Sequence, residues 1–170
     1  WHKNVRIATA LMKKSLNAAL SKKLIENHQL YQLDDNTIFE LLSKLNFNEL
    51  QCALAVKENK LYETIFEIPF DSNNNFHKKL ENLNFRAKFE ETLADKLKCP
   101  LWELVVDIPE NISFESNLLD NKSTVFSKNT IDSFTKNLRK IRIAVKNPNK
   151  INKIIIDESQ DLINELYWDI

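Results

Sequence analysis

The 170-residue chain has three histidines and two cysteines, the residue types that most often bind metals or act as nucleophiles and bases. No aspartate follows His2, His28 or His77, and no carboxylate stands at a metal-ligand spacing from them. Cys52 and Cys99 have neither the spacing nor the histidine partners of a zinc site, so we expect two free thiols. A nucleophilic pair of Cys52 with His28 or His77 stays open, without local support. The residues therefore predict no catalytic group and no metal ligand within this chain.

The chain contains no glycine. Several phosphate-binding and catalytic turns need glycine, because they require positive φ or a close approach of the backbone. This excludes a Walker A loop, a G-x-G-x-x-G dinucleotide turn, a G-x-S-x-G nucleophile elbow and a standard EF-hand loop. Helix C-caps and tight turns must use another residue, and we expect asparagine there, as in the run Asn73–Asn75.

The net charge of zero is unevenly distributed along the chain. Residues 1–25 hold six basic residues and no acidic one, so the remainder carries 18 basic and 24 acidic residues. Clustered like charge attracts anions, which favours a surface for phosphates or for an acidic partner. The simpler interpretation is a solvated helix face.

No segment of the sequence has the features of a membrane protein or of a secreted one. No apolar run approaches the length of a membrane span. The chain opens at Trp1 with a charged helical pattern and shows no signal peptide. We therefore expect a cytoplasmic protein with no membrane partner.

Apolar residues at helical spacing predict the elements of the first half. A first helix is expected over residues 3–26, with its basic residues mostly outside the apolar stripe. Asp34 and Asp35 are suited to capping the start of a second helix. Asn48 opens a third helix, with Gln51 as its capping-box partner. These acids and amides are therefore expected to cap helices, not to catalyse.

Later segments alternate between strand and helix patterns. Three strands are expected where apolar and β-branched residues are dense, at residues 61–68, 102–108 and 141–145. Helices are expected at residues 85–97, 130–137 and 151–166, with loops at 71–75 and 110–129. The fold class is therefore α+β and predominantly α-helical, with N-terminal helices followed by a small mixed α/β portion of about three strands. We divide the chain into a helical part, 1–70, and a C-terminal α+β portion, 71–170.

Five stretches in this order resemble the C-terminal part of the HD-domain phosphohydrolases related to the dNTP triphosphohydrolases. They are His2–Arg6, Leu33–Asp35 before its apolar helix, Lys60–Ile68, Phe89–Ala94 with Val105–Pro109, and Ile141–Val145. Their order and spacing cover nearly the whole chain. One departure is Lys98–Pro100, which stands where the family has a glycine before the second strand.

The resemblance implies a metal-dependent site in which a His, a His-Asp pair and a further Asp hold a divalent cation, Mg, Mn, Zn or Fe. None of these ligands is in this chain, so we expect them in an upstream HD portion. His2 and Lys3 match family positions near bound nucleotide phosphates, and Arg6 is their neighbour by helical spacing. The implied partners are a nucleotide substrate or effector, the HD portion and further copies in a homo-oligomer.

The resemblance implies that this chain is the C-terminal segment of an HD-domain phosphohydrolase acting on (deoxy)nucleoside phosphates, inactive on its own. The alternative is a stand-alone interaction module that binds a partner or nucleic acid through its basic first helix. Nucleic acid is not favoured, because no aromatic residue is interleaved on the basic face. A third hypothesis is an unrelated enzyme with a cysteine nucleophile.

Overall fold

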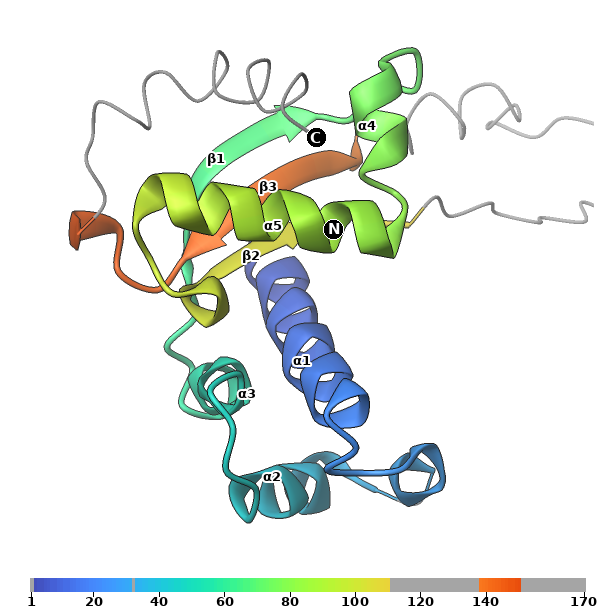
Figure 1. The fold of residues 1–170 in the computed structure, drawn as a ribbon, viewed down its shortest axis with the longest axis vertical. Helices are drawn as coiled ribbons and strands as arrows, with labels where there is room; N and C mark the ends of the chain where they lie inside the picture. The colour runs from blue at the N-terminus through green and yellow to red at the C-terminus, as the bar shows by residue number, and fades with distance from the viewer. Residues whose placement is uncertain (1, 32, 111–137, 151–170) are drawn as a thin grey trace, which may run out of the picture.

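The computed structural model describes residues 2–31, 33–110 and 138–150 (Figure 1). Five α-helices and three strands lie within these residues, in the order α1 (Lys3–Ser21), α2 (Asp35–Ser43), α3 (Leu50–Lys57), β1 (Glu63–Pro69), α4 (Asn75–Lys79), α5 (Leu83–Leu97), β2 (Leu104–Asp107) and β3 (Lys140–Val145). Short 3₁₀ helices lie at Asn27–Leu30, Leu101–Glu103 and Pro148–Lys150. The α+β class, with helices first, is confirmed.

Several predicted elements differ from the structure or lie outside its described part. The first helix ends at Ser21 instead of residue 26, because Lys23 adopts a left-handed φ of 54°. The short helix α4 lies at the end of the predicted loop 71–75 and beyond it. The predicted helices 130–137 and 151–166, and nearly all of the loop 110–129, fall outside the described residues.

The three strands form one antiparallel sheet in the order β1-β3-β2. β3 is central, and all but its first residue are buried, which suits its β-branched composition. β1 contains a register shift between Thr64 and Phe66. The predicted division at residue 70 stays a prediction, and β1, which precedes it, pairs with β3, which follows it.

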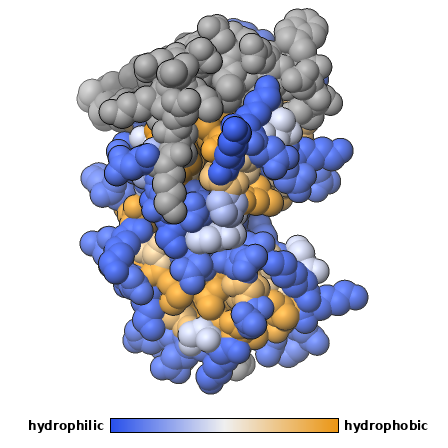
Figure 2. Space-filling view, turned by 60° about the vertical axis from the view of Figure 1, so that its left-hand side comes forward, coloured by the Kyte–Doolittle hydropathy of each residue, from blue (hydrophilic) through white to orange (hydrophobic). Residues whose placement is uncertain are grey.

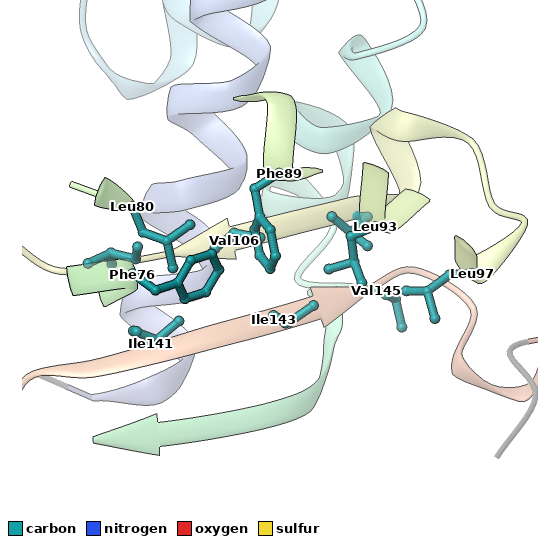
Figure 3. Packing of buried hydrophobic residues seen from close by; sticks show 11 residues of the cluster. Phe76, Leu80, Phe89, Leu93, Leu97, Val106, Ile141, Ile143 and Val145 are labelled. Carbon is teal, nitrogen blue, oxygen red and sulfur yellow. The ribbon is translucent and has the colours of Figure 1, made fainter. Parts of the chain in front are cut away.

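Helices cover both faces of the sheet. On one face α4 and α5 pack against the strands, and Figure 3 shows their apolar side chains meeting those of β2 and β3. On the other face Val105 and Ala144 pack against α1 and α3. Because side chains alternate along a strand, β2 and β3 contribute to both cores.

α1 extends away from the sheet and packs with α2 and α3 (Figure 1). The buried residues of the core between these helices are Ala19, Ile25, Leu42 and Ala53. Figure 2 shows apolar residues on the lower part of the molecule, where Figure 1 places α2 and α3. We call the half-buried set the helical apolar surface; it consists of Ile38, Phe39, Leu41, Leu45, Phe47 and Leu50.

Side-chain caps fix where the helices begin. Asp34 caps α2 as predicted, because its carboxylate accepts the N–H groups of Asn36 and Thr37. The predicted cap at Asn48 is wrong. α3 begins after Glu49, which makes no side-chain cap bond and instead pairs with Lys22.

Asparagine caps helix starts here more often than it supplies positive φ. Asn74 and Asn82 cap the starts of α4 and α5 through their side-chain oxygens. Among the described residues, positive φ occurs at Lys23, Asn59 and Lys98. The expectation of asparagine at left-handed positions is therefore wrong for the two lysines, whose exposed side chains extend into solvent while the helix-end hydrogen bonds hold the backbone.

Lys98→Gly is expected to raise the free energy of unfolding by about 0.5 to 1 kcal/mol. Lys98 has a φ of 53° at the end of α5, where the N–H of Cys99 bonds the carbonyl of Ala94, and glycine adopts this conformation without steric cost. Urea denaturation measures the change. Lys96→Gly, within α5, is the control and should lower stability by about 1 kcal/mol. Equal losses in both variants would contradict the prediction.

None of the helices in the described ranges combines the length and apolar character needed to cross a membrane.

Candidate functional site

The three predicted phosphate-binding residues lie on the first turns of α1. His2 is the N-cap residue and makes no side-chain cap bond, and Lys3 begins the helix. Both are exposed. Arg6 is one turn further on and is turned toward the sheet, where its Nε and Nη2 donate to the two carboxylate oxygens of Asp107 at 3.1 and 2.6 Å. The structure thus leaves His2 and Lys3 accessible and holds Arg6 in an ion pair.

Asp107 is the centre of a charge network across the sheet. Only 3% of its side chain is exposed, and 4% of that of Arg142, whose Nη1 lies 3.6 Å from the Asp107 carboxylate. Arg142 Nε donates to Glu67 at 2.7 Å, and Lys140 also pairs with Glu67. Strand register places Glu67, Arg142 and Asp107 in one row. We call Arg6, Asp107, Arg142, Glu67 and Lys140 the charge network.

A groove of about 380 Å³ runs between α1 and α5, along the edge of β2 that faces away from β3. Its apolar lining residues include Ala10, Val105 and Ile108. Charged residues of both signs line it, namely Arg6, Lys13, Lys14, Arg86, Glu81, Glu90, Asp107 and Glu110. Sequence reasoning named only Arg6 of this set as a site residue, because the groove forms from segments far apart in the chain.

Lys14 and Glu90 line this groove and bond to the edge of β2 that faces away from β3. Their side chains are 12% and 13% exposed and pair at 2.6 Å. Lys14 also donates to the Leu104 carbonyl at 2.7 Å, and Glu90 accepts the N–H of Val106 at 2.8 Å. The two side chains therefore take up backbone groups that a further strand would otherwise bond.

The basic residues of α1, and Lys22 directly after it, are largely paired with acids from later in the chain. Arg6 pairs with Asp107, and the lysines at positions 13, 14 and 22 pair with Glu110, Glu90 and Glu49. The excess of basic residues in the N-terminal segment is thus matched in the fold by acidic residues from later segments. It attaches α1 to β2, to α5 and to the start of α3.

Among the groove cations, Arg86 of α5 differs in having no hydrogen bond to a carboxylate of the described residues. Its Nε donates to the Leu80 carbonyl at 2.9 Å, and its Nη2 makes a long contact of 3.5 Å with the Glu81 carbonyl. Burial lowers the pKa of Arg86, and the nearby Arg139 and Arg6 lower it further, against the opposing charges of Glu90 and Asp107. A partly desolvated guanidinium lacking a carboxylate hydrogen bond is a group suited to receive an anion.

The two cysteines are free and have surroundings unsuited to a nucleophile. Cys52 is buried, with its Sγ 3.6 Å from the Tyr62 hydroxyl and 3.3 Å from the Trp102 carbonyl oxygen. Burial raises the pKa of both Cys52 and Cys99, which lowers the thiolate fraction. These surroundings do not support the hypothesis of a cysteine nucleophile.

Within the described ranges, no group of three or more His, Cys, Asp or Glu side chains is placed to hold a metal ion. His77 has a structural partner instead, because its Nδ1 accepts the backbone N–H of Asp71 at 2.9 Å. Its ring also lies 5.6 Å from that of Phe70. His77 thereby joins α4 to the end of β1.

Acid is expected to destabilise the fold through His77. Burial lowers the pKa of His77 from its usual 6.5, against the charge of Asp71, so the folded state favours the neutral ring. This stability is fully present above pH 6.5 and is lost as pH falls from there through the lowered pKa. Protonation also removes the Asp71 N–H bond, worth about 1 kcal/mol.

The measurement is the free energy of unfolding between pH 8 and pH 5, compared with that of His77→Gln. The variant should show a smaller loss on acidification. His28→Gln, at an exposed histidine, should keep the full loss. An unchanged pH dependence in His77→Gln would show that other groups cause it.

A family model described as "HD associated region" matches residues 1–147. No curated protein and no solved structure matches the chain. The matched residues include α1 to α5, all three described strands, the charge network and the groove.

Proposed function

This chain belongs to the family of HD associated regions, and we propose that it is the C-terminal segment of a metal-dependent HD-domain phosphohydrolase that acts on (deoxy)nucleoside phosphates. The observation that carries the proposal is the match over residues 1–147, taken with the five stretches that resemble those enzymes. The coarser statement, association with HD-domain proteins, follows from family membership. The reaction and the substrate are the proposal.

The role proposed for α1 is to place cations near the phosphates of the bound nucleotide. His2 and Lys3 are exposed at the start of the helix, and Arg6 is oriented by Asp107 one turn later. Positive groups and the free N–H groups of a helix start both favour phosphate. The packing of α1 against β2 makes this a rigid support for the contact.

The helical apolar surface is the face proposed to pack against the HD portion or another copy of the chain. Its side chains are only half-buried, and apolar surface of this kind commonly marks a protein interface. The divalent cation implied for the family finds no ligand set among the described residues. The proposal therefore assigns the ion and the chemical step to the HD portion, and support and phosphate contact to this chain.

The test compares phosphate release from a mixture of dNTPs by residues 1–170 alone with that by the polypeptide that includes the HD portion, both with Mn²⁺. The proposal expects activity only in the second. Hydrolysis by residues 1–170 alone would overturn this division of roles, and inactivity of both on every nucleotide would overturn the proposed reaction.

Variants of the active polypeptide test the phosphate contact. His2→Ala and Lys3→Ala should raise KM, because each removes a group proposed to contact the nucleotide. Lys44→Ala, an exposed lysine after α2, is the matched control and should leave KM unchanged. Equal KM values in all variants would remove α1 from the site. Binding of nucleic acid by an inactive polypeptide would instead favour the alternative of an interaction module.

A further inference from the structure

All four arginines of this chain lie around the end of β2, whereas the other 20 basic residues are lysines spread along the sequence. Arg6 bonds Asp107, and Arg142 lies beside it. Arg139 donates its Nε to the Pro109 carbonyl at 2.6 Å, and Arg86 lines the groove with Asp107. Arginine differs from lysine in presenting a planar fork of N–H donors that matches carboxylate and phosphate oxygens.

The deep acids of the groove are already occupied by donors. Both oxygens of Asp107 accept from Arg6, and those of Glu90 accept from Lys14 and from the N–H of Val106. Arg86 bonds backbone carbonyls only through Nε and Nη2, which leaves its other N–H groups without an acceptor among the described residues. Among the described residues of the groove, Arg86 therefore keeps N–H donors that have no acceptor, and these suit a ligand that only accepts.

The other charged residues that line the groove, Lys13, Glu110 and Glu81, leave it accessible to a ligand. Lys13 and Glu110 form a pair 3.2 Å apart in which both side chains are largely exposed, and such pairs hold weakly. Glu81 is engaged by Arg139. Lys13 is thus free to exchange its partner for a stronger anion.

We propose that the groove between α1 and α5 binds a phosphate group, free or carried by a nucleotide, with Arg86 and Arg6 as its ligands and Lys13 at its rim. The apolar lining residues and the volume of about 380 Å³ leave room for a group attached to the phosphate. This site goes beyond the function proposed above, because it is formed by residues 1–170 alone and requires no HD portion. It can fail while the proposed function stands.

Nuclear magnetic resonance tests the site directly, because four arginines give four guanidinium Nε–Hε signals. Tripolyphosphate is added to residues 1–170, and the Arg86→Lys variant identifies the Arg86 signal. The expected result is a saturable shift of the Arg86 and Arg6 signals, with a smaller change at Arg142, which is buried against Glu67. No shift of the Arg86 signal at millimolar tripolyphosphate would overturn the proposal.

Calorimetry of Arg86→Gln separates a site from general surface charge. The dissociation constant for tripolyphosphate should rise about 10-fold or more, because a charged hydrogen-bond donor is lost. Lys88→Gln is the matched control, since it removes the same charge from an exposed position two residues along α5. Equal weakening in both would overturn the site. If Arg86→Gln does not fold, Arg86→Lys replaces it in the same measurement. An equal dissociation constant for tripolyphosphate in Arg86→Lys and the native chain would show that the planar guanidinium group is not required.

Two further ligands, dATP and adenosine, test whether the site binds a nucleotide or the phosphate chain alone. Tighter binding of dATP than of tripolyphosphate would identify a nucleotide site, and equal binding would identify a site for the phosphate chain itself. Adenosine should not compete with tripolyphosphate. Competition by adenosine at equal concentration would contradict recognition through phosphate.

Discussion

Asp107→Ala is expected to lower the free energy of unfolding by about 3 to 5 kcal/mol. The variant leaves Arg142, which is 4% exposed, with a buried charge and no anion on that side, and it removes both carboxylate bonds to Arg6. Losing one partner of a buried ion pair costs more than the pair contributes, because the remaining charge stays desolvated. Urea denaturation followed by circular dichroism measures the loss.

Two variants separate this effect from the loss of an ordinary surface acid. Asp95→Ala, at an exposed position of α5, should change stability by less than about 0.5 kcal/mol. In an Arg142→Met background, Asp107→Ala should cost clearly less, because the stranded charge is gone. The same loss in both backgrounds would show that Asp107 and Arg142 are not coupled.

Phe89→Ala should destabilise the fold by about 3 to 5 kcal/mol through the apolar core on the other face of the sheet. Phe89 is 1% exposed and extends from α5 toward β2 and β3 (Figure 3). Its ring meets that of Phe76 edge-on, with centroids 5.4 Å apart. Alanine would leave a cavity between α5 and the sheet, since neighbouring side chains relax only in part.

Thermal and urea denaturation of the Phe89 variants give the measurement. Phe89→Leu keeps most of the volume and should cost less than the alanine variant. Val5→Ala, at an exposed position of α1, should change stability by less than about 0.5 kcal/mol. A Phe89→Ala protein as stable as Val5→Ala would mean that the α5 face contributes little to the fold.

The elements with a long, regular apolar pattern were predictable. The strands β1, β2 and β3 lie within or one residue beyond the predicted segments, because β-branched and apolar residues crowd between prolines there. The cap at Asp34 was predictable because an aspartate directly before a helical apolar pattern commonly accepts the first free N–H groups of the helix. α4 was missed because five residues are too few to show a helical period.

The candidate site was less predictable than the elements, because it depends on register and long-range packing. Asp107 and Arg142 are polar residues within two buried strands, which was a readable signal, but only the antiparallel register places them side by side. Arg86 has nothing in its local sequence that distinguishes it from the lysines of α5. Lys98 shows a further limit, since a left-handed φ at a lysine is set by the end of the helix and not by the preference of the residue.

The position of β3 at the centre of the sheet has a consequence for how the chain folds. β1 and β2 do not pair with each other within the described sheet, and both depend on a strand that follows them in sequence. Glu67 meets Arg142 across a separation of 75 residues, so the contacts that complete the sheet are non-local. Non-local contacts slow folding, because loop closure must precede the stabilising contacts. During synthesis the α1–α3 helices can form early, while β1 and β2 keep open edges until β3 leaves the ribosome.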